Sequence, residues 1–170
     1  MAVETKIEIF GLKEALKELK SVDPEMRKDI NFRAAEIVKP FVNAAKQNYP
    51  TRYLSGMSRV WSDRGRQVFP YNQAKAIKGV VLKIDTAKKN KGVIVVIQKD
   101  PAAAIIDMAG KKGGSNARGA SMIAGLTLHF GTPSRVMWPA YEHNAGAVEK
   151  GFLEVINDLM TRLNRNLISR

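Results

Sequence analysis

The sequence predicts an α+β fold in which a small antiparallel sheet packs against a long kinked helix and a C-terminal helix. Three observations lead to this prediction. Apolar residues recur at helical spacing across residues 24–48 and again across residues 139–168. Two β-branched runs, residues 79–85 and 92–98, lie between those helices. A length of 170 residues with a hydrophobic share of 45% fits a single domain with long loops.

Residues 12–49 are predicted to be helical. Leucine and alanine recur at three- and four-residue spacing through residues 12–19, which predicts a short amphipathic helix. Asp23 and Pro24 then supply a capping carboxylate and a proline at a first helical position, so a second, longer helix should begin there. Pro40 removes one hydrogen bond from that helix and should kink it.

The strands are predicted from alternation and β-branching. Residues 6–10 alternate in apolar character and predict a short strand, and residues 79–98 predict an antiparallel hairpin. Between these, residues 50–75 scatter aromatic and arginine residues without a period, so we expect a basic irregular segment there. After the hairpin, Asp100 should cap a short helix over residues 102–108.

The last third of the chain combines a loop with a long helix. Residues 110–125 contain five glycines and no hydrophobic period, which predicts a mobile loop that is functional or becomes ordered on binding. Residues 126–130 are apolar enough for one more strand. The step Trp138-Pro139 should lead into a C-terminal helix over residues 139–168.

Positive charge is concentrated in the middle of the chain. The formal net charge is +12. Residues 39–135 contain 17 Lys and Arg against four Asp, a net of +13, whereas the two ends together are close to neutral. This middle part is therefore suited to an acidic partner, either a phosphate backbone or an acidic protein surface.

The residues that enzymes use are scarce, so we expect no catalytic activity, no cofactor and no metal site. The chain has no cysteine, which excludes thiolate ligands and disulfides. His129 and His143 are isolated from each other in the sequence, and such histidines are usually packing or capping residues. The four middle carboxylates are better explained as helix caps and turn residues than as a metal-binding pair: Asp63, Asp85, Asp100 and Asp107. No apolar run reaches the length of a membrane-spanning helix, so we expect no membrane contact.

Two features of this basic middle part of the chain have alternative interpretations. The run from Gly110 to Ser115 has glycines and lysines as phosphate-binding loops do, but it lacks their residue order, and a solvated loop explains it better. The mixture of aromatics and arginines between Tyr53 and Tyr71 suits stacking on bases. The same mixture is enriched in protein interfaces. The residues that we expect to contact a partner are Arg59, Trp61, Arg64, Arg66, Lys88, Lys89, Lys91, Lys111, Lys112, Arg118 and Trp138.

Three short motifs resemble those of the neck and tail-completion proteins of long-tailed, siphovirus-type bacteriophages. That family opens with a leucine-spaced helix after glycine, ends a long helix in a proline-containing turn, and enters its last helix through an aromatic-proline-alanine step. The similarity spans most of the chain. The matching segments are Gly11-Leu12-Lys13-Glu14-Ala15-Leu16, Tyr49-Pro50-Thr51 and Arg135-Val-Met-Trp-Pro-Ala-Tyr-Glu142.

The resemblance implies a structural subunit of the virion that is assembled in the bacterial cytoplasm. Such a subunit forms a ring, expected to be a hexamer, that joins the connector to the tail-terminator or tail-tube proteins around a channel crossed by DNA. We expect the hairpin and the glycine-rich loop to carry contacts between subunits, and the basic charges to face a protein partner or the outside. The alternative is a basic protein that binds nucleic acid without sequence specificity.

Overall fold

A computed structural model of the chain describes residues 3–10, 24–52, 54–85, 91–110 and 119–168. The predicted helix over residues 12–19 lies outside these residues. So do Lys88 and Lys89 of the hairpin turn, and Lys111, Lys112 and Arg118 of the glycine-rich loop.

The main sheet has three antiparallel strands in the order β1 (Val3–Phe10), β5 (Lys91–Gln98) and β4 (Val80–Asp85). The predicted hairpin is therefore confirmed, and the N-terminal strand pairs with the other edge of β5. Ile94 of β5 is opposite Ile84 on one side and Ile7 on the other. This register places the alternate residues Ile94 and Val96 in the core, where both are almost fully buried.

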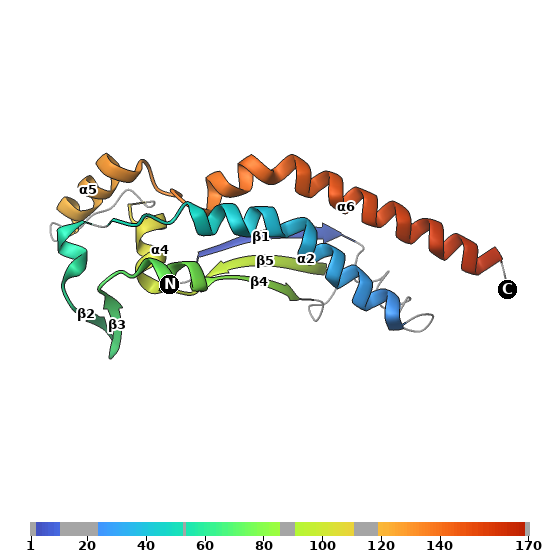
Figure 1. The fold of residues 1–170 in the computed structure, drawn as a ribbon, viewed down its shortest axis with the longest axis horizontal. Helices are drawn as coiled ribbons and strands as arrows, with labels where there is room; N and C mark the ends of the chain where they lie inside the picture. The colour runs from blue at the N-terminus through green and yellow to red at the C-terminus, as the bar shows by residue number, and fades with distance from the viewer. Residues whose placement is uncertain (1–2, 11–23, 53, 86–90, 111–118, 169–170) are drawn as a thin grey trace.

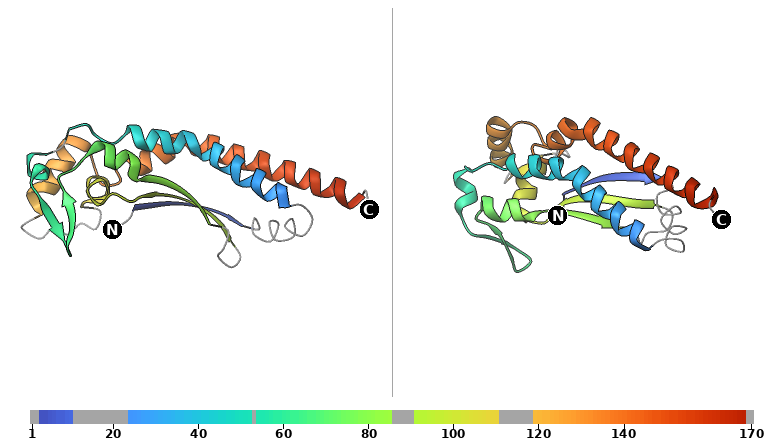
Figure 2. Two further views of the ribbon diagram at one scale, coloured as in Figure 1. Left: turned by 60° about the horizontal axis from the view of Figure 1, so that its bottom comes forward. Right: turned by 45° about the vertical axis from the view of Figure 1, so that its right-hand side comes forward.

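Two long helices pack together over one face of this sheet (Figures 1 and 2). They are α2 (Pro24–Gln47) and α6 (Met137–Ile168), the long first and last helices of the described chain, and the predicted α+β class is confirmed. α2 runs through Pro40 as one helix. Its buried residues recur every three or four positions, as the sequence indicates: Ile30, Ala34, Val38, Phe41 and Ala45.

Two short helices close the end of the sheet where β4 begins and β5 ends. They are α3 (Gln73–Gly79) and α4 (Pro101–Met108). The Asp100 carboxylate accepts a hydrogen bond of 2.9 Å from the Ala103 N–H, so the predicted cap of α4 is confirmed. The buried Gln98 amide links the two helices, because it donates to the Ala76 carbonyl and accepts from the Asp100 N–H.

The prediction of an irregular segment over residues 50–75 is wrong in part. After a 3-10 turn, η1 (Ser55–Ser58), the strands β2 (Trp61–Asp63) and β3 (Arg66–Phe69) form a second antiparallel hairpin, and α3 begins at Gln73. These strands are too short to show a clear period of two. A register shift between Trp61 and Ser62 further breaks the alternation.

The predicted strand over residues 126–130 is also wrong, because these residues belong to α5 (Ala120–Phe130). Residues 120–125 of the predicted loop therefore belong to α5, and residues 111–118 lie outside the described residues. Leu126 is fully buried, with Met122 and Phe130 partly buried one turn away on either side. The buried period is thus helical, although the apolar run alone fits either structure.

Candidate functional site

The turn of the second hairpin presents two arginines in a fixed geometry. Arg64 and Gly65 have φ values of 48° and 75°, and they join Asp63 to Arg66, which are opposite each other in the ladder. Positive φ at both central residues defines a type I′ turn, whose twist matches that of the two strands. Arg64 therefore lies at the tip and Arg66 directly after it, and both side chains are exposed.

Trp61 fixes the base of this hairpin. Its ring packs edge-on against Phe69, with ring centroids 4.8 Å apart and an interplanar angle of 64°. Phe69 is fully buried, whereas Trp61 remains 42% exposed and the preceding Val60 is 75% exposed. We call five of the exposed residues of this region the hairpin surface: Arg59, Val60, Trp61, Arg64 and Arg66.

A cavity of about 540 Å³ lies between the hairpin surface and α5. Arg59 and Trp61 line it on one side and Ser121, Met122 and Gly125 on the other. Gly125 allows a close approach, since a Cβ there would lie 3.0 Å from Leu54 Cδ1. Further along α5, Leu128 is 80% exposed, and the helix carries no Lys, Arg, Asp or Glu. The exposed face of α5 is thus uncharged beside a strongly basic hairpin.

The cations of this region are not neutralised by neighbours. Residues 51–79 contain six Lys and Arg and a single acid, Asp63. All six cationic side chains are exposed, and within the described chain none of them takes part in an ion pair. Unpaired cations beside exposed apolar side chains form a surface suited to an acidic partner.

The other predicted contact residues are placed elsewhere or not described. Trp138 lies at the start of α6, where it is 49% exposed and its ring is 5.5 Å from that of Tyr141. Tyr141 in turn packs edge-on against Phe41 of α2. The backbone of Lys91 pairs with Phe10 at the end of β5. Of the predicted residues that the structure describes, only Arg59, Trp61, Arg64 and Arg66 lie in one region.

Asp107 and Arg135 link α4 to the start of α6. The Asp107 carboxylate is fully buried and accepts a 2.8 Å hydrogen bond from the Val136 N–H, just before α6. The Arg135 guanidinium donates in return to the carbonyls of Ile106 and Ala109 at the end of α4. Burial raises the pKa of Asp107 and lowers that of Arg135. Asp107 therefore lies in the last turn of α4 and does not cap that helix as predicted; its carboxylate instead binds the backbone just before α6.

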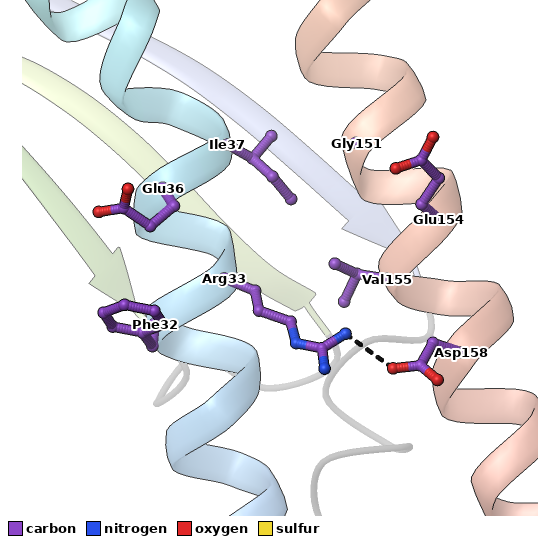
Figure 3. A pocket seen from close by; sticks show the side chains of 8 residues that line it. All are labelled: Phe32, Arg33, Glu36, Ile37, Gly151, Glu154, Val155 and Asp158. Atoms are coloured by element: carbon purple, nitrogen blue, oxygen red, sulfur yellow. Dashed lines mark hydrogen bonds and ion pairs between the residues drawn. The ribbon is translucent and has the colours of Figure 1, made fainter.

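A second hollow, of about 460 Å³, lies between α2 and α6 (Figure 3). Figure 3 shows Ile37 and Val155 pointing toward each other between the two helices. Gly151 permits this approach, since a Cβ there would lie 3.0 Å from Ile37 Cγ1. We call this hollow the α2–α6 groove, and its lining residues are Phe32, Arg33, Glu36, Ile37, Gly151, Glu154, Val155 and Asp158.

Ion pairs close one end of the α2–α6 groove. Arg33 donates to Asp158 at 2.7 Å and pairs with Asp29, and Arg162 is 3.0 Å from Asp158. The hydrogen bond from Arg33 is the main reason why the pKa of Asp158 is lowered. Glu36 pairs with Lys39 at 3.0 Å. Glu154 is exposed and has no ion-pair partner in the described chain.

The Asp158 network predicts a specific dependence of stability on pH. A carboxyl whose pKa is lowered by folding stabilises the protein above its unfolded pKa of about 3.9, and this contribution is lost as pH falls through the folded pKa. The melting temperature of Asp158→Asn should therefore fall less than that of the wild type between pH 6 and pH 2. Asp63→Asn, which removes a carboxylate outside the network, is the control and should follow the wild type. Parallel curves for Asp158→Asn and the wild type would contradict the assignment.

The hairpin turn predicts the effect of a substitution at Gly65. A β-branched residue at positive φ is strained, so Gly65→Val should destabilise the turn by about 1–2 kcal/mol. The readout is Trp61 fluorescence in a Trp138→Phe background, which should shift to the red as the ring leaves Phe69. Arg64→Gly relieves positive φ at the neighbouring position and should leave the spectrum unchanged. An unchanged spectrum for Gly65→Val would be evidence against the turn.

Groups that support catalysis are not gathered in the described chain. His129 and His143 are both exposed, on α5 and α6 respectively. Among the residues that the structure describes, there is no cluster of His, Asp and Glu that could hold a metal ion. No helix in the described ranges is both long and apolar enough to cross a membrane.

Comparison with known proteins gave no match: no protein-family model, no curated protein and no solved structure matched the chain.

Sequence reasoning missed Val60 and Leu128, and it missed the α2–α6 groove. The segment Asp63-Arg64-Gly65-Arg66 does contain a hairpin signal, because a glycine stands at the second of the two turn positions between the short strands. The apolar run predicts a strand for Leu128, and that prediction does not place its side chain on the outer face of α5. The groove joins residues more than a hundred positions apart, and no local pattern reveals it.

Proposed function

We propose that this chain is a structural subunit of a bacteriophage virion that forms a ring at the neck or the top of the tail. The observation that carries the proposal is the hairpin surface, where unpaired arginines lie beside exposed Val60 and Trp61 and beside the uncharged face of α5. Such surfaces are typical of protein interfaces, because arginine and aromatic side chains are enriched there. The motif resemblance of residues 135–142 adds the neck and tail-completion class.

The local structure at residues 135–142 is compatible with the resemblance. α6 begins at Met137, and Trp138, Pro139 and Ala140 form its first turn. Val136 and Met137 are buried, whereas Trp138 is half exposed. An aromatic side chain that is held at a helix start but open to solvent suits a contact with a second protein. In the proposed ring, the partners are further copies of the chain and the connector, tail-terminator or tail-tube proteins.

Gene deletion in the phage that encodes the chain tests this proposal. We expect the mutant to produce filled heads and separate tails that do not join, as seen by electron microscopy. Supplying the chain from a plasmid should restore complete particles. Complete, infectious particles in the absence of the chain would overturn the proposal.

Nucleic-acid binding is the second candidate function, because exposed Trp61 and its neighbouring arginines also suit bases and phosphates. Counterion release then requires the affinity for arbitrary duplex DNA to fall steeply with salt. For six phosphate contacts, raising salt from 50 to 200 mM should weaken binding by roughly a thousandfold. Weak binding with a shallow salt dependence would argue against this second function.

A further inference from the structure

The basic hairpin and the acidic part of α6 lie in different parts of the molecule. Residues 51–79, which include β2 and β3, have six cations and one acid, a net of +5. Residues 137–158, the first two thirds of α6, have four carboxylates and one lysine, a net of −3. β2 and β3 lie at one end of the long axis, and α6 runs from the middle of the molecule away from them (Figure 1). The last part of α6, residues 159–168, has Arg162 and Arg165 and no carboxylate. A single copy therefore cannot bring the two surfaces together.

The α2–α6 groove has the features of a docking site for a surface that is both basic and apolar. Its floor is apolar, with Ile37, Val155 and Gly151. Three carboxylates and a single arginine line it, and that arginine is already engaged by Asp158 (Figure 3). Glu154 is left without an ion-pair partner in the described chain. An incoming cation with an apolar neighbour would find both a free carboxylate and an apolar floor.

The hairpin surface offers the matching groups. Arg59 and Val60 are adjacent, and the Val60 side chain is 75% exposed. Arg64 and Arg66 extend the positive charge to the tip of the hairpin. The hairpin surface thus combines an apolar side chain, which suits the apolar floor of the α2–α6 groove, with cations, which suit its free carboxylate.

We infer that the hairpin surface of one copy docks into the α2–α6 groove of a second copy. The inference deepens the proposed function, on which it rests, by naming the contact between neighbouring subunits. The contact is heterologous, because two different surfaces meet, and a heterologous contact that repeats around an axis closes into a ring. Pairing of two hairpin surfaces with each other is disfavoured, since it brings like charges together.

Charge reversal tests this inference on the full chain. Arg59→Glu and Glu154→Arg should each weaken self-association by at least about tenfold at low salt, because each places like charges in the contact. Combining both changes restores opposite charges, and self-association should return to within about threefold of the wild type. The measurement is sedimentation velocity across a concentration series, with circular dichroism to show that each variant is folded.

Two control variants carry the same charge changes outside the contact. Glu149→Arg lies on another face of α6, and Lys99→Glu lies between β5 and α4; both residues are exposed. Both controls should self-associate like the wild type. Wild-type protein that stays monomeric, single reversals without effect, or a double variant that is not restored would each overturn the inference.

The remaining outcomes separate this contact from the other functions. If Arg59→Glu abolishes DNA binding and leaves self-association unchanged, the hairpin surface binds nucleic acid and the inference fails. Rings that form regardless of both reversals overturn this contact alone and leave the proposed function standing. Heads and tails that join without the chain overturn the proposed function, whatever the reversals do.

Discussion

Gly79→Ala is expected to destabilise the protein by about 3 kcal/mol, because the added methyl group displaces the buried side-chain amide of Gln98. A Cβ at Gly79 would collide with the Gln98 side-chain oxygen and lie 3.0 Å from the Asp100 N. Gln98 is fully buried, and its amide makes hydrogen bonds of 2.9 Å to the Ala76 carbonyl and 2.7 Å from the Asp100 N–H. Moving the side chain would leave buried polar groups without partners, and each such group costs roughly 1–3 kcal/mol.

Urea unfolding measures this effect, with Gly146→Ala as the matched control. Gly146 lies within α6, and a Cβ there would meet nothing within 4 Å. The control should gain about 0.5–1 kcal/mol, since alanine has the higher helix propensity. Equal effects of the two substitutions would contradict the packing described around Gln98.

Arg135→Ala is expected to cost about 3 kcal/mol, because it leaves carbonyls at the end of α4 and the loop before α6 without donors. The guanidinium donates to the carbonyls of Gly131 at 2.7 Å, Ile106 at 2.9 Å and Ala109 at 3.1 Å. It also lies near the buried Asp107, whose raised pKa it partly offsets. Removing the arginine therefore removes one of the interactions that lower the pKa of Asp107, although the backbone hydrogen bonds to the carboxylate remain.

Arg135→Lys separates geometry from charge in the same unfolding experiment. A lysine keeps the positive charge but lacks the planar guanidinium group that reaches three carbonyls. Most of the loss in the free energy of unfolding should therefore remain. Arg59→Ala is the control, because the Arg59 side chain is exposed. Full rescue by lysine would show that charge near Asp107 matters more than the carbonyl contacts.

The elements that sequence reasoning found are those set by local chemistry. Asp100 and Pro101 define the start of α4 by themselves, and the β-branched runs define β4 and β5. The apolar stripes of α2 and α6 are long enough to show a helical period without tertiary information. The sequence therefore predicts both helices without any information on the contact between them.

The elements that sequence reasoning missed are short, so their apolar residues show no clear period. Residues 126–130 form a helix because Leu126 is buried with Met122, which a five-residue apolar run does not reveal. β2 and β3 are held by the Trp61 and Phe69 rings and by an arginine at positive φ, where glycine or asparagine is usual. Four of the predicted contact residues lie together on the hairpin surface, but the α2–α6 groove needed the packing of two helices to become visible.

Native mass spectrometry of the purified full chain tests the central claim, that this is a ring-forming assembly subunit, most directly. At low salt and with increasing protein concentration, we expect one closed oligomer to become dominant, and the family resemblance implies six copies. Closure means that no larger species grows at higher concentration. A monomer at every concentration, or an open-ended series of oligomers, would contradict the claim.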